Sequence, residues 1–292
     1  MKPKFDARTD PDVPRGMSLE LLADLHLLTR DGQLNADARR KLKQIRHLVG
    51  LLRPALDDVL ARYEAPSIID CGAGKSYLGF LLYELVLAPA NKGELWAVES
   101  RPELTAQGAA RARKFGHVRM HFVDGSIANA PVPAQPNLVA ALHACDTATD
   151  DALLLGIARR ADHIAVVPCC QAEVARQLDA AKSVKHRDAA DYALFEHGLH
   201  RREFGSHLTN VVRALALEAH GYQVTVTELV GWEHSAKNEI IVAKRVGRSN
   251  AHAQRKLDEL LHRFAIAPAL VRGLAALPPA AGAATSATEA QH

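Results

Sequence analysis

The chain has 292 residues, of which 48% are hydrophobic and 5% aromatic, and its formal net charge is +3. This composition suffices for a large, mainly aliphatic core, and so weak a positive charge does not by itself indicate nucleic-acid binding. No apolar run is long and uncharged enough to span a bilayer, and the charged N-terminus lacks the apolar region of a signal peptide. The four cysteines fit no secretory disulfide framework, which favours a reducing, cytoplasmic setting.

Residues 1–64 predict a helical N-terminal extension. Residues 1–16 are polar and Pro-rich and are expected to form an extended lead-in, and an apolar face at helical spacing begins after Ser18. A longer helix is expected over 35–63, where Gly50 and Pro54 could introduce a kink. It carries a basic block that is either a solvated helix face or a surface for a polyanion such as RNA. The block consists of Arg39, Arg40, Lys41, Lys43 and Arg46.

From residue 65 onward, predicted strands alternate with predicted helices. Such alternation is typical of an α/β fold with a mostly parallel sheet and helices on both faces. No helix separates the last two strands, which predicts an antiparallel hairpin at one edge. Strands are expected at 66–71, 94–99, 117–123, 137–143, 162–168, 222–231 and 239–245. Helices are expected at 75–87, 102–115, 148–160, 171–181 and 205–220, with a polar, His-rich insert at 182–203.

The organisation that follows is one main domain with short additions. We expect the α/β domain to occupy 65–247 and a C-terminal helical segment to occupy 248–276. Within that segment one amphipathic helix is expected over 250–274. The tail at 277–292, rich in Ala, Pro and Thr, is expected to be disordered.

A glycine-rich turn follows the first predicted strand of the domain, in the sequence Asp70-Cys71-Gly72-Ala73-Gly74. Such a turn lets the backbone approach a ligand closely. A phosphate-binding P-loop would need glycine at position 69, which is Ile69, and a dinucleotide fingerprint would need it at position 77, which is Tyr77. The remaining pattern, Asp-x-Gly-x-Gly, resembles the first motif of Rossmann-like methyltransferases that use S-adenosylmethionine (SAM).

Acidic residues end the next two strands of the predicted sheet. Glu99 is suited to bind both hydroxyls of a ribose, or else it is an exposed residue that starts a helix. Asp124 could accept a hydrogen bond from an adenine amino group, or else it forms an ordinary Asp-Gly turn. Asp70 is suited to the amino group of a methionine moiety. Ligands of open α/β sheets lie beyond the carboxyl ends of the strands, so these residues should share one edge.

Two cysteine-containing segments follow the fourth and fifth strands. His143, Cys145, Cys169 and Cys170 could supply metal ligands, although adjacent cysteines rarely both reach one tetrahedral ion. Cys169, in the pair Pro168-Cys169, could instead be a nucleophile of the kind that pyrimidine C5-methyltransferases use, although their dipeptide follows the fourth strand. The third alternative is that the cysteines are small apolar side chains that pack at strand ends. We expect no metal.

The segments together resemble one subgroup of the class I SAM-dependent methyltransferases, which includes the tRNA ribose 2′-O-methyltransferase of the acceptor stem. The resemblance covers about residues 40–245. Ser76 and Asp146 stand where the pattern of the subgroup has glycine, and the zinc-binding segments of the tRNA enzyme are absent. The matching motifs are Asp70-Cys-Gly-Ala-Gly-Lys-Ser-Tyr-Leu78, Leu142-His-Ala-Cys-Asp-Thr-Ala-Thr-Asp150, Val167-Pro-Cys-Cys170 and Lys237-Asn238-Glu-Ile240.

The resemblance implies SAM as cofactor and RNA (tRNA or rRNA) as the acceptor. The implied cofactor-binding residues are Asp70, Cys71, Gly72, Ala73, Gly74, Glu99, Asp124, Leu142 and His143. His143 and Asp146 are candidates to orient the substrate or act as a base, although His143 could equally be structural. The implied substrate contacts are Cys169, Cys170, Lys237 and Asn238. Alternatives are a small-molecule or protein methyltransferase, or a non-catalytic module that binds SAM or RNA.

Overall fold

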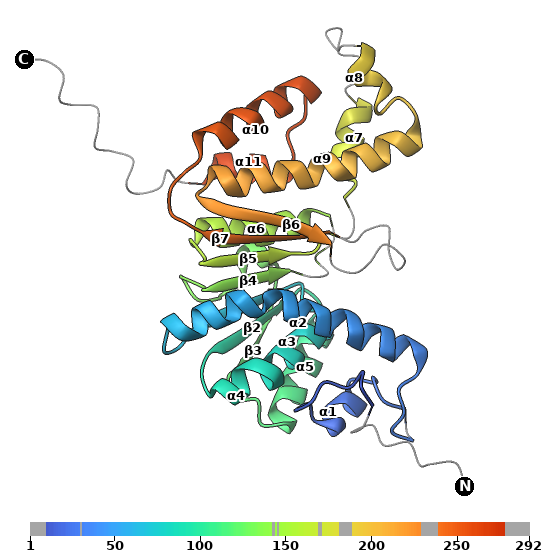
Figure 1. Ribbon diagram of the computed structural model, residues 1–292, viewed down its shortest axis with the longest axis vertical. Coiled ribbons are helices and arrows are strands. Elements are labelled where there is room, and N and C mark those ends of the chain that lie inside the picture. The colour runs from blue at the N-terminus through green and yellow to red at the C-terminus, as the bar shows by residue number, and fades with distance from the viewer. Residues whose placement is uncertain are drawn as a thin grey trace, which may run out of the picture.

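A seven-stranded sheet forms the centre of the protein (Figure 1). The computed structural model describes residues 10–29, 31–141, 144, 146–168, 171–180, 189–228 and 239–277. The strand order is β3-β2-β1-β4-β5-β7-β6. The strands are β1 (Ser67–Cys71), β2 (Glu94–Glu99), β3 (Met120–Asp124), β4 (Leu138–Ala141), β5 (His163–Val166), β6 (Tyr222–Glu228) and β7 (Glu239–Arg245).

The first five strands are parallel to one another, and β7 runs antiparallel to both β5 and β6. The prediction of a mostly parallel sheet with an antiparallel edge is therefore confirmed. Strand β1 lies between β2 and β4, and every residue from Ser67 to Cys71 is buried. A strand covered on both faces explains why Ile68 and Ile69 are adjacent apolar residues, with no polar residue alternating between them.

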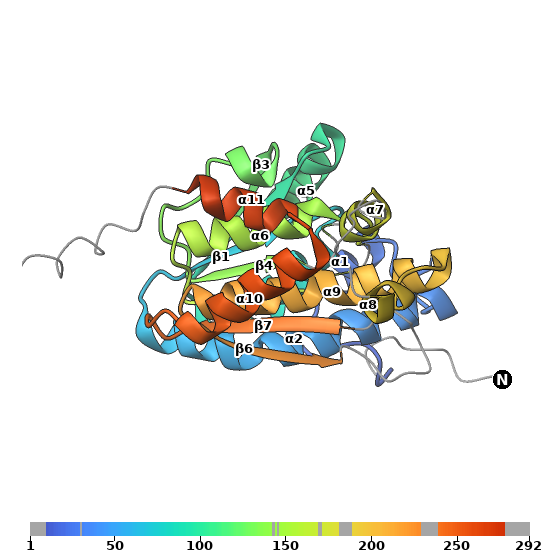
Figure 2. The same cartoon turned by 90° about the horizontal axis from the view of Figure 1, so that it is seen from above.

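Helices cover both faces of the sheet (Figure 2). One core cluster joins α2 and α3 to the sheet, and the other joins α6, α9, α10 and α11 to its opposite face. None of the described helices is long and apolar enough to cross a membrane. The helical elements are α1 (Leu19–Asp24), α2 (Ala36–Arg62), α3 (Tyr77–Leu82), the π-helical η2 (Tyr83–Leu87), α4 (Ala88–Ala90), α5 (Pro102–Lys114), the 3-10 turn η3 (Ile127–Asn129), α6 (Thr147–Ala158), α7 (Glu173–Ala180), α8 (Ala189–Ala193), α9 (Gly198–Ala219), α10 (Ala251–Phe264) and α11 (Ala269–Ala276).

Side-chain caps start the two N-terminal helices where the sequence predicts them. The Ser18 hydroxyl accepts from the Leu21 N–H, and the Asn35 side chain accepts from the Ala38 N–H at 2.7 Å. Helix α2 is assigned as one helix over 27 residues that include Pro54. The predicted extended lead-in is wrong from residue 10 onward. Its turns bury Val13 and Met17, since these apolar side chains have a core within reach.

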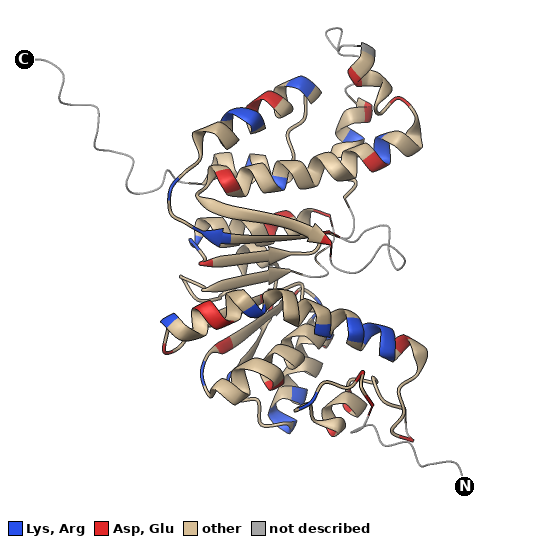
Figure 3. Ribbon diagram, viewed as in Figure 1, with Lys and Arg blue, Asp and Glu red and all other residues tan. Residues whose placement is uncertain are grey.

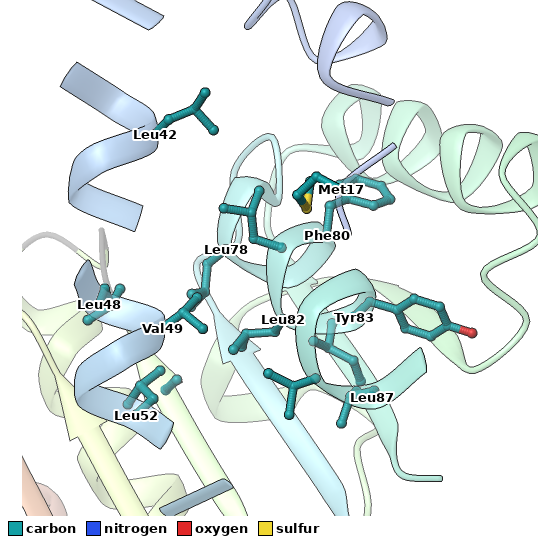
Figure 4. Packing of buried hydrophobic residues seen from close by; sticks show 14 of the residues in the cluster. Met17, Leu42, Leu48, Val49, Leu52, Leu78, Phe80, Leu82, Tyr83 and Leu87 are labelled. Carbon is teal, nitrogen blue, oxygen red and sulfur yellow. The ribbon is translucent and has the colours of Figure 1, made fainter. Parts of the chain in front are cut away.

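The N-terminal extension packs directly on the helix that follows the glycine turn (Figure 4). Leu42 and Leu52 of α2 belong to the same buried cluster as Leu78 and Phe80 of α3. Polar contacts add to this packing, since the Tyr77 hydroxyl donates to the Leu25 carbonyl and the Ser18 N–H donates to the Glu84 carboxylate at 2.8 Å. The extension therefore buttresses the segment that presents the turn. The predicted domain boundary at 64/65 falls between α2 and β1.

Two predicted boundaries on the C-terminal side are wrong. The segment predicted as a polar insert at 182–203 contains α8 and the first turns of α9, which begins at Gly198 rather than at 205. The single helix predicted over 250–274 is two helices. Ala265 ends α10 in a left-handed conformation, and Pro268 precedes α11. Residues 278–292 of the predicted tail lie outside the described part of the chain.

Candidate functional site

The carboxyl ends of the parallel strands meet at one edge of the sheet, which lies to the right in Figure 1. Because ligands of open α/β sheets bind at this edge, it is the candidate site. Strand pairing places Asp70 opposite Ala97 of β2 and Ala140 of β4. It also places Glu99 opposite Asp124. Three acids predicted from separate strand ends therefore lie on one edge.

The glycine turn is held to β2 by hydrogen bonds. Gly72 and Gly74 have φ angles of 68° and 58°, which L side chains rarely adopt. Between them, the Ala73 N–H donates to the Val98 carbonyl at 2.9 Å. Two glycines are therefore needed for the path of the chain, and the turn exposes backbone rather than side chains.

Glu99 is the acceptor that fixes the end of this turn. Its side chain is 6% exposed, and its carboxylate accepts hydrogen bonds from the Gly74 N–H at 2.7 Å and the Arg101 N–H at 3.1 Å. The Arg101 guanidinium also donates to it, with Nε at 2.8 Å and Nη2 at 3.2 Å. Although burial raises the pKa of Glu99, these hydrogen bonds outweigh it and hold the pKa below its usual value. Glu99 is thus a buried, ionised acid, not an exposed residue at the start of a helix.

Asp70 is a second buried acid, two residues before Gly72. Its side-chain oxygen Oδ2 is buried with no hydrogen-bond partner, and the residue is 2% exposed. Burial, together with the negative charge of Glu99, raises the pKa of Asp70 to about 7. A buried acid with an unsatisfied oxygen is costly unless a ligand completes its bonding. This orphaned oxygen fits a cationic ligand group.

Two other residues predicted for the cofactor site, Cys71 and Asp124, differ from Glu99 and Asp70 in their surroundings. Cys71 belongs to the core cluster that joins the sheet to α6, α9, α10 and α11. Burial raises the pKa of its thiol well above the usual range, so it is not a reactive group. Asp124 is exposed at the end of β3. The Gly125 N–H, which follows it, donates to the Glu99 carbonyl at 3.1 Å, so the Asp-Gly turn is also present.

Several residues that the sequence analysis named for the cofactor, the substrate or a metal lie outside the described residues. These are Leu142, His143, Cys145, Cys169, Cys170, Lys237 and Asn238. Among the residues that are described, no group of three or more His, Cys, Asp or Glu could hold a metal ion.

Asp146 is described, and its carboxylate is occupied by partners within the protein. It accepts from the Ala172 N–H at 3.1 Å and from Arg176 at 3.3 Å, which joins the start of α6 to the start of α7. Its backbone has φ 52° and ψ −118°, a combination that favours glycine. Ser76 also adopts a left-handed backbone, with φ 55°. Ser76 and Asp146, which replace glycine in the subgroup pattern, thus both adopt backbone conformations in which glycine would be less strained.

A buried arginine that the sequence analysis did not single out organises the same region. Arg213 of α9 is 1% exposed and donates to the Asp150 carboxylate at 2.8 Å and to the Asp146 carbonyl at 3.0 Å. Burial raises the pKa of Asp150, an effect that Arg213 opposes. An arginine in the middle of a predicted helix is usually exposed, so the sequence offers no reason to expect Arg213 in the core. Its partner Asp150 ends the motif Leu142–Asp150 and was the only sequence feature that could have indicated the pair.

Polar contacts extend from Arg213 toward the segments that follow β5 and precede β7. Asn210 accepts from Arg213 at 3.3 Å and from Gln171 at 3.0 Å, and it donates to Glu239 at 2.8 Å. Gln171 directly follows Cys170, and Glu239 directly follows Asn238. Helix α9 therefore ties together the segments that follow β4, follow β5 and precede β7.

The basic block of α2 is partly neutralised within the chain. Arg39 pairs with Asp10 at 2.8 Å and also with Asp12, and Lys43 pairs with Asp12 at 3.4 Å. The hydrogen bond from Arg39 lowers the pKa of Asp10. Lys41 pairs with Asp37 at 2.7 Å, and Arg46 donates to the Pro11 carbonyl. Arg40 and Arg46 are exposed and form no ion pair within the described part of the chain.

Residues 40–177 match the model of a protein family described as a methyltransferase domain. The matched segment contains the glycine turn, Glu99, Asp124 and Asp146. No curated protein matches the sequence.

Several solved structures resemble this one at low sequence identity. An rRNA methylase from Streptococcus thermophilus is 10% identical, with 67% of this chain and 94% of that chain covered and a TM-score of 0.39. Magnesium protoporphyrin IX methyltransferase from Synechocystis, with bound SAM, is 12% identical, with 80% and 100% covered and a TM-score of 0.43. Precorrin-6y C5,15-methyltransferase from Geobacter metallireducens is 17% identical, with 66% and 86% covered and a TM-score of 0.38.

The mostly parallel sheet with its antiparallel edge is a Rossmann-like α/β fold, and residues 40–177 within it are similar to a methyltransferase domain. Antiparallel β7 lies between β5 and β6, as the resemblance described from the sequence implies.

The strain at Ser76 leads to a stability prediction. Ser76→Gly should raise the free energy of unfolding by about 1 kcal/mol, because it relieves the left-handed strain and removes a buried hydroxyl that has no partner. Urea unfolding followed by circular dichroism measures the change. Ser76→Ala is the matched control, since it removes the hydroxyl but keeps the strained Cβ, so it should gain less. A glycine variant less stable than the natural protein would contradict this account.

The buried arginine leads to a second prediction. Arg213→Met should lower the free energy of unfolding by about 3–5 kcal/mol, because Asp150 would be left buried without its cation. Replacing both residues by Arg213→Met and Asp150→Leu should cost less than the single change, since no uncompensated charge is left. Arg202→Met, exposed on the same helix, is the control. Equal effects at positions 202 and 213 would show that the network does not hold α9 in place.

Proposed function

We propose that the edge formed by β1, β2 and β3 binds SAM and that the protein transfers its methyl group to an acceptor. The observation that carries this proposal is the unpartnered oxygen of buried Asp70, beside ionised Glu99 and above two glycines with positive φ. This arrangement offers acceptors for a cationic amine and for a ribose diol, next to backbone that a ligand can approach.

Six of the nine residues predicted for the cofactor site have positions that support a role. Glu99 would bind the ribose hydroxyls, Asp70 the amino group of the methionine part, and Asp124 the adenine amino group. Gly72, Ala73 and Gly74 would line the path of the ligand with backbone. When bound, SAM supplies a methyl group already activated by its sulfonium, so the protein mainly has to align the acceptor and exclude water.

The acceptor side would be built by the three segments that α9 ties together. Asp146 uses its carboxylate to hold Ala172 and Arg176, so we assign it the role of positioning this wall rather than of taking a proton. His143 stays the candidate base or orienting group, and Leu142 stays a candidate cofactor contact. Cys169, Cys170, Lys237 and Asn238 stay candidate substrate contacts, because the resemblance implies that role.

We propose RNA as the class of acceptor. The motif resemblance supports this proposal, and so does the gathering of Lys and Arg on the first half of α2, which lies toward the carboxyl edge of the sheet (Figures 1 and 3). Because Arg39 and Lys43 are paired with Asp10 and Asp12, the exposed Arg40 and Arg46 are the better candidates for phosphate contacts. A small-molecule or protein acceptor, or SAM binding without turnover, are the alternatives that the experiments below distinguish.

Titration with SAM tests the cofactor site. Calorimetry between pH 5.5 and 7.5 should show binding whose affinity rises roughly tenfold with pH, because Asp70 has a pKa of about 7 and must lose its proton to meet a cation. Asp70→Asn should bind more weakly and with little pH dependence over this range. Glu99→Ala should bind about tenfold more weakly or worse, since it loses the ribose acceptor.

Glu103→Ala is the control for these variants, because Glu103 is an exposed acid in the first turn of α5. Its affinity for SAM should equal that of the natural protein. A folded natural protein that does not bind SAM, or one whose binding ignores Glu99→Ala, would contradict the assignment of this edge as the cofactor site.

Salt-dependent binding tests the RNA proposal. The double variant Arg40→Gln and Arg46→Gln should bind total RNA from a strain lacking the gene several-fold more weakly, and its log–log salt slope should be shallower by about one to two. Arg53→Gln with Arg113→Gln, which removes two exposed charges elsewhere, should leave both quantities unchanged.

Labelled SAM then identifies the acceptor itself. Incubation with the same RNA should place the label in RNA, in a position that nuclease digestion releases as a methylated nucleoside. Label found only in protein or in small metabolites would contradict RNA as the acceptor and would identify the labelled class as the acceptor instead. SAM binding without label transfer to any of the three pools would favour the non-catalytic module.

A further inference from the structure

The Arg101 side chain lies on the residue that the proposed function assigns to the ribose. Its guanidinium forms two hydrogen bonds with Glu99, Nε with Oε1 at 2.8 Å and Nη2 with Oε2 at 3.2 Å. It also lies over the glycine turn, because a Cβ built on Gly74 would be 3.7 Å from Nη2. One side chain therefore covers both surfaces that a nucleoside would contact.

The Glu99 carboxylate has no lone pair free to accept a further hydrogen bond. Oxygen Oε1 accepts from the Arg101 N–H and from Nε, and Oε2 accepts from the Gly74 N–H and from Nη2. A carboxylate has about four lone-pair sites, and four donors fill them. A ribose diol brings two more donors, so it can bind Glu99 only if two of the present donors leave.

The two guanidinium donors are those that can leave. The N–H groups of Gly74 and Arg101 are fixed by the backbone of the turn and of the strand end. The Arg101 side chain is 59% exposed, against 6% for Glu99, and it precedes the first residue of α5, so its outer atoms can swing into solvent without moving the helix. Because the guanidinium end of this pair is exposed, water already competes for its contact with Glu99, and a ligand can replace it.

The geometry points to Arg101 as the residue that sets the affinity of the cofactor site, by occupying the place of the ribose diol until a diol-bearing nucleoside displaces it. This inference rests on the proposed function and adds a competitor within the chain. The apparent dissociation constant is then the intrinsic constant divided by the fraction of molecules in which Glu99 is uncovered. The pairing keeps Glu99 ionised and ordered while the site is empty, at a cost in affinity.

The test is a titration with S-adenosylhomocysteine, which has the ribose but no sulfonium charge, so direct repulsion between Arg101 and the ligand is small. Arg101→Met keeps both backbone N–H donors and should bind this ligand roughly three- to tenfold more tightly than the natural protein. Arg101→Lys should lie in between, because an ammonium can still pair with Glu99 but lacks the planar fork. Arg113→Met, exposed near the other end of α5, should leave the affinity unchanged.

Salt supplies a readout that a merely structural role would not move. Raising the ionic strength weakens the exposed pair of Arg101 with Glu99, so it should tighten binding to the natural protein and leave Arg101→Met unaffected. Unchanged or weaker binding by Arg101→Met, with the fold intact by circular dichroism, would overturn the inference and leave the proposed function standing. If Arg101→Met fails to fold, the Arg101→Lys titration decides in the same way. A natural protein that binds no S-adenosylhomocysteine would overturn the proposed function and this inference together.

Discussion

The hydrogen bond from the Gly74 N–H to the buried Glu99 carboxylate is the constraint on which the candidate site depends. It joins the turn after β1 to the end of β2, so the two glycines, Asp70 and Glu99 are held in one arrangement. Burial and the negative charge of Glu99 raise the pKa of Asp70, whereas hydrogen bonds from Arg101 and from the Gly74 N–H outweigh burial and lower the pKa of Glu99. An edge of a sheet that only had to be stable would not need two buried acids, one of which lacks a partner for an oxygen. The electrostatics of the junction therefore suit a ligand that carries both a cation and hydroxyl donors.

The opposite half of the edge is organised by a different interaction. Arg213 is buried on α9, yet its hydrogen bonds reach Asp146 and Asp150 at the start of α6 and, through Asn210, Gln171 and Glu239. A buried charge is tolerated only where it is paired and hydrogen-bonded, so this network fixes the relative positions of three loops. Under the proposed function, the cofactor side rests on a turn that is hydrogen-bonded to a strand, and the acceptor side rests on loops joined by one helix.

The fold was largely predictable from the sequence because hydrophobic periodicity and turn residues act locally. Strand β1, the glycine turn and the caps at Ser18 and Asn35 are all set by neighbours within a few residues. Arg101 and Arg213 were missed because their partners depend on tertiary structure, and nothing in a charged side chain says whether it faces water. The start of α9 and the break at Ala265 were misplaced because a polar helix end and a short left-handed linker leave little trace in the hydrophobic pattern. Ser76 and Asp146 replace glycine in the subgroup pattern, and the structure shows that both adopt a positive φ, a strain that the sequence analysis did not predict.

A crystal structure of the protein with bound S-adenosylhomocysteine would test the central claim most directly. The account predicts that both ribose hydroxyls lie within hydrogen-bond distance of the Glu99 carboxylate, with the Arg101 guanidinium moved away from it and the amino group of the ligand facing Asp70. A ligand bound elsewhere in the protein, or one whose ribose leaves Glu99 paired with the Arg101 side chain, would contradict it.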